Sequence, residues 1–361
     1  MSIGWTERMD HKNNLLRRIV LPIIVVIIAF TAASCAPAET VIETVSITDM
    51  AGRQIEIPSN VESVFCADPM NAITLYTLAP DKLLGWCYPL SEAEAQYLLP
   101  EYRDLPVYGM KDNINIEAVI DAQPDIAILT GTLDASLSAA ADILQSRLGI
   151  PVVVLDSALT SAPSVYALLG TVTGVKAQAQ VLAEYAQSTF DAIIDIPENA
   201  RVSIYYANGI DSLNTSSKGS PASEIFDMVA ADNVCDLPSD AGDRIQVTKE
   251  HIIAWNPTII FVNGEPTENL LGSTAAQLMM VDAAYANVDA VANGNVLSIP
   301  KAPFAWLDRP RSVNRLIGIR WLGSLVYPRQ YNFSDDDIKE FYHLFYHLEL
   351  TNAQVSDLKY Q

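Results

Sequence analysis

A short segment at residues 306–310 carries side chains that could hold an oxygen-rich ligand. The guanidinium of Arg309 offers planar, bidentate and permanently charged recognition of carboxylate-type oxygens. Trp306 could stack on the body of such a ligand, and packing in the core is an equally good role for it. Arg309 could instead pair with Asp308 or cap the helix that follows. The segment therefore predicts a binding site with Arg309 as its first ligand contact.

Other candidate residues stand where predicted strands end. A large ligand needs apolar and aromatic surfaces for its body and a few fixed donors and acceptors for its polar groups. Side chains of both kinds follow the apolar runs, namely Tyr108, Tyr206, Phe304, Lys301, Asp68 and Asn208. Lys301 could be a second donor to an anion or a solvated charge. Asp68 could accept from ligand amines or cap the helix that begins near Pro69.

Cysteine and histidine are too sparse to indicate a metal site in the chain itself. Cys66 and Cys87 end two neighbouring predicted strands, so they could form a disulfide, ligate a metal or remain small buried apolar residues. His343 and His347 have the i, i+4 spacing that can bind a metal, and solvated or half-packed histidines are the simpler interpretation. A site for a bare ion needs several histidine and carboxylate ligands, so the sequence argues against such a site. We predict no metal ligands and no cofactor.

The motifs of common enzymes are missing from the sequence. It has no Gly-Xxx-Ser-Xxx-Gly elbow, no phosphate-binding loop ending in Gly-Lys and no His-Glu-Xxx-Xxx-His. An enzyme would need a titratable pair that converges in the site, and Asp68 with Lys301 is the candidate pair. We predict that the protein is not an enzyme, with a surface-anchored enzyme on the same scaffold as the alternative.

The composition predicts a globular chain of two domains. Of its 361 residues, 50% are apolar and 18% are charged, so the chain can bury more than one core. The formal net charge of −21 repels phosphate backbones, which argues against nucleic acid as a partner.

The N-terminus has the order of an export signal. Basic residues at positions 12, 17 and 18 precede an uncharged apolar run over 19–33, and small residues lead to Cys35. Residues 1–35 therefore predict a signal peptide and lipoprotein anchor in which Cys35 becomes the lipidated first residue. The alternative is a retained helix, because residues 19–38 carry no charge and could span a bilayer. Both interpretations place the globular part on the outer face of the cytoplasmic membrane.

Strand-like apolar runs alternate with helical stretches along the rest of the chain. A hairpin is predicted at 45–58, and single strands are predicted at 61–66, 82–87, 125–130, 151–156, 201–207, 258–263 and 295–300. This alternation predicts right-handed βαβ units and mostly parallel sheets. The stretch 163–194 has no strand signal and predicts one long helix. The tail 313–358 is helical, with an N-cap candidate at Ser334.

These elements predict two α/β lobes. The N-terminal lobe covers 44–160, the C-terminal lobe with its helical tail covers 195–361, and the helix at 163–194 joins them. In an open parallel sheet the ligand lies beyond the carboxyl ends of the strands, so two facing lobes predict a site in the cleft between them. A helical connection should limit closure to a modest rocking motion.

Six segments resemble the iron-siderophore and vitamin B12 class of periplasmic binding proteins, and among these the iron-complex receptors. The segments are 48–58, 79–85, 115–128, 215–234, 249–264 and 306–322. The most specific signal is the matching helix-to-strand unit in each lobe, at 115–128 and 249–264. The family's Trp-Asp-Arg-Pro-Pro-Ser pattern has Arg311 in place of its second proline. The resemblance implies two Rossmann-like lobes joined by a single long helix, the class III periplasmic-binding-protein fold.

The resemblance also implies a function. We expect an extracytoplasmic substrate-binding component of an ABC importer for a metal chelate, with an iron(III)-siderophore first and a corrinoid, haem or nickel complex as alternatives. Glu117 and Glu250 open equivalent helices of the two lobes, and the matching glutamates of the family pair with arginines of the permease. Stabilisation of the helix dipoles would also explain both residues. The expected partners are the permease and ATPase subunits and the membrane, with the protein itself a monomer.

Overall fold

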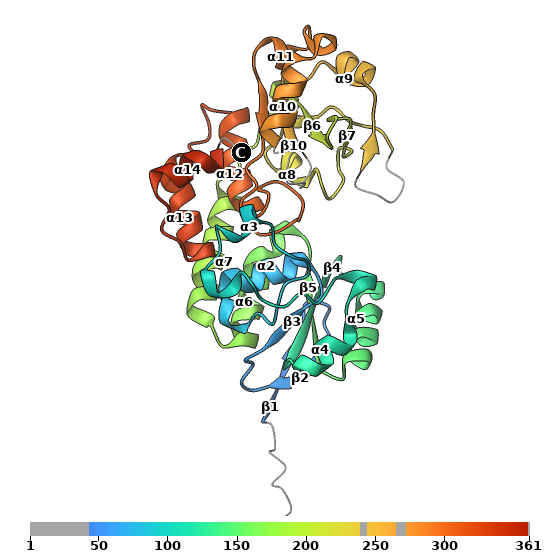
Figure 1. Ribbon diagram of the computed structural model, residues 1–361, viewed down its shortest axis with the longest axis vertical. Coiled ribbons are helices and arrows are strands. Elements are labelled where there is room, and N and C mark those ends of the chain that lie inside the picture. The colour runs from blue at the N-terminus through green and yellow to red at the C-terminus, as the bar shows by residue number, and fades with distance from the viewer. Residues whose placement is uncertain (1–42, 239–243, 265–271, 360–361) are drawn as a thin grey trace, which may run out of the picture. The chain divides into compact units, whose positions relative to one another are not determined.

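The computed structural model describes residues 43–238, 244–264 and 272–359 (Figure 1). The predicted export segment at 1–35, with Cys35, lies outside the described residues. Residues Thr44–Gln361 form one compact unit that contains both lobes. None of the helices in the described ranges is long and apolar enough to cross a membrane.

A two-stranded hairpin opens the first lobe. Strands β1 (Thr44–Thr48) and β2 (Gln54–Pro58) pair antiparallel, as the sequence predicts. The Asp49 side chain closes the turn, because its Oδ1 atom accepts from the backbone N–H of Arg53 at 2.9 Å. Its Oδ2 atom accepts from the backbone N–H of Val154 at 3.2 Å, so the same carboxylate also fastens the hairpin to the sheet.

The first lobe is built on a three-stranded parallel sheet in the order β3–β4–β5. Its strands, which confirm three predicted ones, are β3 (Val64–Cys66), β4 (Ile126–Gly131) and β5 (Val152–Asp156). The helices and 3-10 turns around the sheet are α2 (Pro69–Leu78), η1 (Pro80–Lys82), α3 (Glu92–Ala95), η2 (Pro100–Tyr102), η3 (Lys111–Asn113), α4 (Ile116–Ala122), α5 (Ala135–Leu148), η4 (Leu159–Ser161) and α6 (Ala162–Thr173). α2 and α6 share a core with one face, and α4 and α5 with the other, so the strands are apolar on both faces.

The predicted strand at 82–87 is wrong. This segment forms only isolated bridges in the described part of the chain, one beside β3 and one between Trp86 and Val107. A Cβ atom on Gly85 would lie 2.3 Å from the carbonyl oxygen of Pro106. The segment therefore passes close to Pro106, whose carbonyl oxygen accepts from the Trp86 backbone N–H at 2.9 Å.

The predicted single helix at 163–194 is two helices. α6 is followed by α7 (Lys176–Asp191), and Gly174 between them caps α6 in the left-handed conformation with φ of 77°. Glycine reaches this conformation without a steric cost, which allows the helix to end there. The two helices then pack side by side, and Gly170 allows their close approach. A Cβ atom at this position would lie 2.4 Å from the Cβ atom of Ala179.

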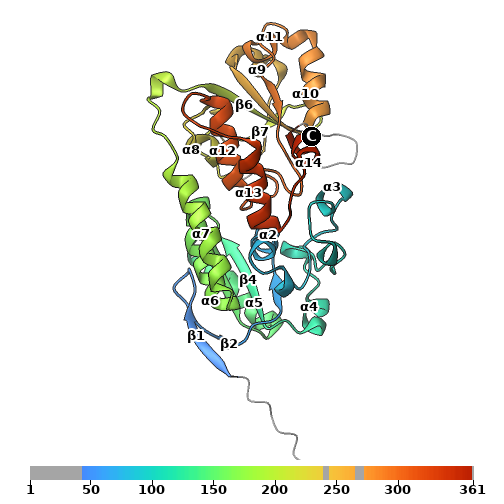
Figure 2. The same ribbon diagram turned by 90° about the vertical axis from the view of Figure 1, so that its left-hand side faces the viewer.

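Helix α7 alone connects the lobes. It packs against α2 of the first lobe and against α12 (Arg315–Val326) and α13 (Asp335–Tyr346) of the tail (Figure 2). α6 packs against α2 and η4 and so belongs to the first lobe.

The second lobe has a mixed sheet in the order β11–β10–β6–β7–β9, with β8 beside β6. The strands are β6 (Ser203–Asn208), β7 (Asn214–Thr215), β8 (Asp232–Asn233), β9 (Ile245–Gln246), β10 (Ile259–Gly264) and β11 (Val296–Ser298). The three predicted strands correspond to β6, β10 and β11, which pair in parallel. The remaining helical elements are η5 (Glu198–Ala200), α8 (Glu224–Met228), α9 (Lys249–Trp255), α10 (Gly272–Val281), η6 (Ala283–Tyr285) and α11 (Asp289–Ala292).

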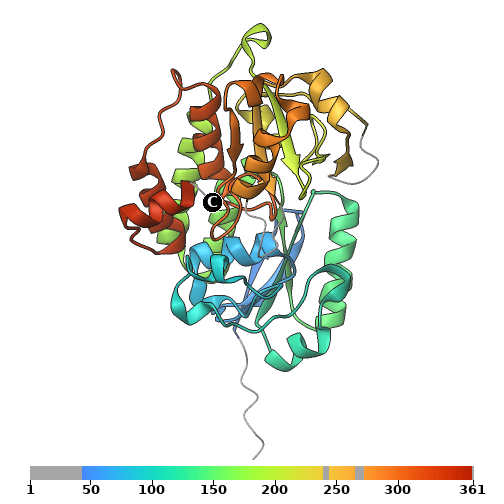
Figure 3. The ribbon, with the colours of Figure 1, turned by 45° about the horizontal axis from the view of Figure 1, so that its top comes forward.

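The tail returns to the first lobe. It contains α12, α13 and α14 (Asn352–Lys359), and α13 begins at the predicted N-cap Ser334. α13 packs against α2 and α7 (Figure 3). Aromatic rings meet at this seam at centroid distances of 5.9 to 6.2 Å, in the pairs Tyr76–Tyr346, Trp86–Phe304 and Tyr97–Tyr342. One hydrophobic core therefore runs from the first sheet into the tail.

Candidate functional site

A cleft of about 770 Å³ lies beyond the carboxyl ends of β3, β4 and β5. The first lobe contributes Asp68, Met70, Met110, Lys111, Thr130 and Asp156 to its lining. Loops and helix starts of the second lobe contribute Ser220, Glu224, Asp227, Pro310, Arg311 and Arg315. The cleft lies where open α/β sheets bind their ligands, as the sequence predicts.

Asp68 organises the wall of the cleft in the first lobe. Its Oδ1 atom accepts from the backbone N–H of Asn71 at 3.0 Å and caps α2, and its Oδ2 atom accepts from the Asn71 side chain at 2.6 Å. Thr130 at the end of β4 donates its hydroxyl proton to the Asn71 side-chain oxygen. Burial raises the pKa of Asp68 to about 6, against the opposing effect of the hydrogen bond from the Asn71 backbone. These bonds hold the polar groups of two strands and one helix in fixed positions.

Arg315 is the buried cation of the opposite wall. Its side chain is 2% exposed, and its Nη2 atom lies 2.5 Å from the Glu224 carboxylate. Its Nε atom is buried and has no hydrogen-bond partner among the described residues. The sequence did not single out Arg315, although it lies in the segment 306–322 that carries part of the family resemblance. The sequence signal that could have indicated Arg315 is an arginine at the start of a predicted helix within that segment.

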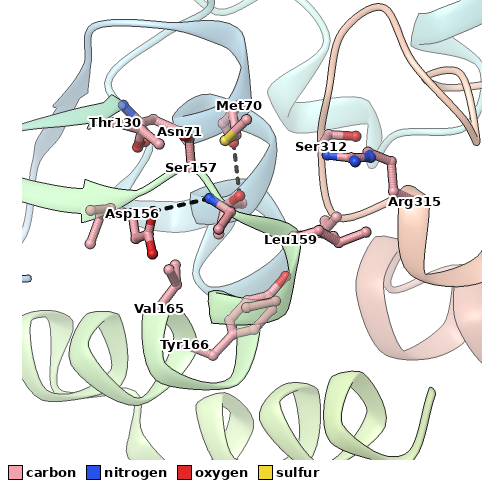
Figure 4. Close-up of a pocket in the computed structure, with 15 residues that line it drawn as sticks. Met70, Asn71, Thr130, Asp156, Ser157, Leu159, Val165, Tyr166, Ser312 and Arg315 are labelled. Carbon is pink, nitrogen blue, oxygen red and sulfur yellow. Dashed lines mark hydrogen bonds between the residues drawn. The ribbon is translucent and has the colours of Figure 1, made fainter. Parts of the chain in front are cut away.

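A small chamber of about 40 Å³ lies beside the cleft and shares part of its lining. Figure 4 shows Arg315 and Ser312 across this chamber from Met70 and Ser157, with the ring of Tyr166 below. The chamber has room for a few ordered waters or a small ligand group.

The predicted first contact, Arg309, does not line this cleft, although its neighbours Pro310 and Arg311 do. Its Nε atom lies 3.5 Å from the Asp308 carboxylate, which is the ion pair that the sequence left as an alternative. Burial raises the pKa of Tyr206, the Asp308 carboxylate raises it further and the Arg309 guanidinium lowers it. The Arg309 side chain is 28% exposed and lies beside the Asp308 and Tyr206 side chains.

Four other predicted contacts are buried in packed cores. Trp306 donates from Nε1 to the Tyr342 hydroxyl at 3.3 Å, and its ring meets Trp321 edge to face. The rest contact neighbours within the structure as well, with Phe304 on Trp86, Tyr206 on Phe226 and Tyr108 on Phe65. Their side chains pack against these neighbours and do not line the cleft. All four side chains therefore pack in the core, which is the role that the sequence left open for Trp306.

The remaining predicted contacts divide. Asp68 lines the cleft, whereas Lys301 and Asn208 do not. Asn208 is buried and accepts from the Asn263 side chain at 3.0 Å. The structure therefore places one of the predicted ligand contacts in the lining of the cleft, and the others do not line it. A direct ligand contact by those residues stays a prediction.

A family model described as periplasmic binding protein matches residues 74–303. The chain belongs to this periplasmic binding protein family. The family consists of solute-binding proteins of ABC transporters, which act outside the cytoplasm and are not enzymes. The resemblance and the class III fold that the sequence predicts are confirmed, with α7 as the single connecting helix.

Several relatives share this fold over most of the chain. The molybdate-binding protein MolA of Haemophilus influenzae is 24% identical over 333 residues, which cover 83% of this chain and 90% of MolA. An ABC transporter solute binding protein from Sulfurospirillum deleyianum has a TM-score of 0.78 at 27% identity, covering 87% of this chain and 98% of its own. The triscatecholate siderophore binding protein FeuA of Bacillus subtilis has a TM-score of 0.55 at 12% identity, and the match covers 79% of this chain and 99% of FeuA.

The two glutamates predicted to dock on a permease occupy equivalent positions in this periplasmic binding protein. Glu117 lies in the first turn of α4 and Glu250 in the first turn of α9, and both are exposed. A hydrogen bond from the Thr248 side chain lowers the pKa of Glu250, so that carboxylate stays ionised. Both side chains are available to a partner, and their docking role stays a prediction.

The cysteines and histidines hold no joint site in the described residues. Cys66 and Cys87 are free and buried, and burial raises the pKa of both thiols, that of Cys87 to about 12. They are therefore neutral packed thiols, one of the three roles the sequence left open. His343 lies 2.6 Å from the Glu349 carboxylate, whereas half-buried His347 ends α13. The described chain has no group of three or more His, Cys, Asp or Glu side chains placed to hold a metal ion.

Proposed function

We propose that this protein is the solute-binding component of an ABC importer for a metal chelate, with an iron(III)-siderophore as the leading cargo. The cleft carries this proposal. At about 770 Å³ it falls in the range of roughly 300 to 1,000 Å³ typical of sites for molecules of several hundred daltons. A hydrated single ion would leave most of this space filled with water.

The lining matches the rim of a chelate rather than its metal. A chelate supplies the metal's ligands itself, so the protein needs apolar contacts for the body and hydrogen-bonding groups for the edge. The thioethers of Met70 and Met110 offer the first, and the hydroxyl of Ser220 and the guanidinium of Arg311 offer the second. A corrinoid, a haem or a nickel complex has the same general needs and remains an alternative cargo.

The similarity to MolA favours molybdate as a second candidate. Molybdate is a small dianion and would occupy only part of the cleft, beside a cation such as Arg311 or Arg315. Binding of molybdate in preference to every chelate would replace the leading proposal with this one.

The proposal extends to the partners and the location of the protein. We expect a permease and an ATPase as partners, with Glu117 and Glu250 contacting permease arginines, and a monomeric receptor on the outer face of the membrane. Cys35 would carry the lipid, or the helix before it would be retained as an anchor. Mass spectrometry of the membrane-extracted protein separates these forms, because lipidation removes residues before Cys35 and adds acyl mass.

Calorimetric titration of the full-length chain in mild detergent tests the cargo. The probes are ferrichrome, ferric enterobactin, cyanocobalamin, haemin, a nickel–histidine complex and molybdate. We expect saturable binding of a ferric siderophore, weakened about tenfold or more by Arg311→Ala because a cleft donor is lost. Arg329→Ala, an exposed arginine outside the cleft lining, is the matched control and should bind normally. Binding of none of the chelates would refute the proposal.

A further inference from the structure

The charged side chains that line the cleft are nearly balanced. Four are acidic, namely Asp68, Asp156, Glu224 and Asp227. Three are basic, namely Lys111, Arg311 and Arg315. The chain as a whole has 43 acidic and 22 basic residues, so the cleft is far less acidic than the sequence around it. Nor does the described lining offer the excess of cations that a multiply charged anion requires.

Two of the second-lobe charges in the cleft, Arg315 and Glu224, form a fixed ion pair. Arg315 and Glu224 neutralise each other across 2.5 Å, and the arginine is almost fully buried. Arg315 therefore cannot leave its partner and act as an uncompensated cation unless a ligand replaces Glu224. Its free Nε–H remains a hydrogen-bond donor without adding net charge to the wall.

The first-lobe carboxylates are held as firmly. Asp156 accepts from the Ala158 backbone at 3.1 Å and from the Ser161 hydroxyl at 2.5 Å. The Asp68 carboxylate accepts two hydrogen bonds from Asn71 at the start of α2. The positive charge of Lys111 favours the ionised form of this carboxylate. Neither carboxylate can turn away from the cleft without losing these bonds.

A ligand that enters this cleft exchanges water for charged groups of both signs. A neutral ligand with both donors and acceptors at its edge can pair with the guanidinium of Arg311 and the carboxylate of Asp227. A trianion would be brought close to four carboxylates while losing its own hydration, and the three cations are already offset by them. Discrimination of this kind comes from repulsion of the wrong ligand as much as from attraction of the right one.

We propose that the balanced lining of the cleft selects metal complexes without net charge, of the ferric trihydroxamate type, over multiply anionic ligands such as ferric tris-catecholates and molybdate. This inference rests on the proposed function as a chelate receptor. It gives the cargo a chemical class that neither the family nor the size of the cleft specifies.

Competition titration of the full-length chain in mild detergent tests the selection, with ferrichrome as the neutral trihydroxamate and ferric enterobactin as the trianionic tris-catecholate. We expect ferrichrome to bind at least about tenfold more tightly, since one unfavourable charge contact at an effective dielectric constant near 20 exceeds the energy of a tenfold change. Glu224→Gln removes one carboxylate and should narrow this preference about tenfold. Glu56→Gln changes the net charge equally but lies on the hairpin outside the cleft, and it should leave the preference unchanged.

Each outcome decides between the two proposals. Tighter binding of ferric enterobactin or of molybdate overturns the charge selection, and enterobactin binding leaves the chelate function standing. Binding of cyanocobalamin alone supports the charge selection, because that complex is also neutral, and moves the cargo to corrinoids. Binding of none overturns both proposals. If Glu224→Gln does not fold, Asp227→Asn at an exposed position replaces it, and an unchanged preference in the folded variant refutes the role of the lining charges.

Discussion

The Nη2 atom of Arg315 lies 2.5 Å from the Glu224 carboxylate and joins the first turns of α12 and α8 at the wall of the cleft. The arginine is 2% exposed and the glutamate 33%, so the cation depends on this partner far more than the anion does. This asymmetry gives the pair a structural role in addition to any contact with a ligand.

Glu224→Ala should therefore destabilise the fold strongly. The change leaves a buried guanidinium without a countercharge, which costs about 3 kcal/mol in the free energy of unfolding. Denaturant unfolding measures this loss, with Glu56→Ala on the exposed face of β2 as the control, expected within about 0.5 kcal/mol of wild type. A loss no larger than in the control would show that water or another group already satisfies Arg315.

Arg309 and Arg311 should differ in what they affect. Asp308 is buried, and burial raises its pKa while the nearby Arg309 guanidinium lowers it. Arg309→Ala removes that neighbour and should lower the free energy of unfolding by about 1 to 3 kcal/mol at neutral pH. Arg311→Ala should mainly weaken ligand binding, because Arg311 lines the cleft. Larger loss of affinity in Arg309→Ala than in Arg311→Ala would restore Arg309 as the ligand contact predicted from the sequence.

Gly318→Ala should displace the loop that carries Arg311. A Cβ atom on Gly318 would lie 2.0 Å from the carbonyl oxygen of Trp306, and that backbone atom cannot yield as a flexible side chain would. We expect a loss of about 2 to 3 kcal/mol in the free energy of unfolding and weaker ligand binding. Ser324→Ala in the same helix is the control, with an expected change near 0.5 kcal/mol. Normal stability and affinity in Gly318→Ala would mean that helix α12 shifts freely.

The stability of the fold should carry a pH signature of Asp68. Its pKa is about 6 in the folded protein, above the ordinary value of 3.8, because burial disfavours the carboxylate. Folding thus favours the protonated form, so the ionised carboxylate destabilises the fold above pH 6, and this cost disappears as the pH falls from about 6 to about 4. Asp68→Asn keeps an N-cap acceptor and should gain up to about 2 kcal/mol over wild type near pH 8 and little near pH 4. A difference that does not change with pH would contradict the raised pKa.

The two lobes should unfold together. The ring of Tyr346 in the tail lies 6.1 Å from that of Tyr76 in the first lobe, within a single hydrophobic core. We expect the amides of β4 and β10 to lose hydrogen-exchange protection in one cooperative step. Tyr346→Ala should lower the stability of both strands by about 4 kcal/mol, because it opens a cavity in the shared core. Loss of protection in β10 alone would indicate that the lobes fold independently.

The pattern of the sequence was sufficient for the fold class. Runs such as 125–130 and 258–263 are apolar on both faces, and this pattern alone predicts central parallel strands, which β4 and β10 confirm. The stretch 163–194 was harder, because composition does not reveal that Gly174 ends one helix and that a second helix begins at Lys176. Gly174 adopts its left-handed φ where the chain turns back and α7 packs against α6.

The site was less accessible from the sequence. Asp68 could be placed, because it follows a buried strand and precedes a helix that begins with proline, and both signals are local. The orientation of Arg309 and Trp306 could not be placed, since the side on which a loop residue points depends on the packing of α12 against the tail. The pairing of Arg315 with Glu224, 91 residues apart, is likewise a product of the assembled lobe. The fold class, the family and the position of the cleft thus follow from local patterns, whereas long-range packing decides which charged side chains line the cleft.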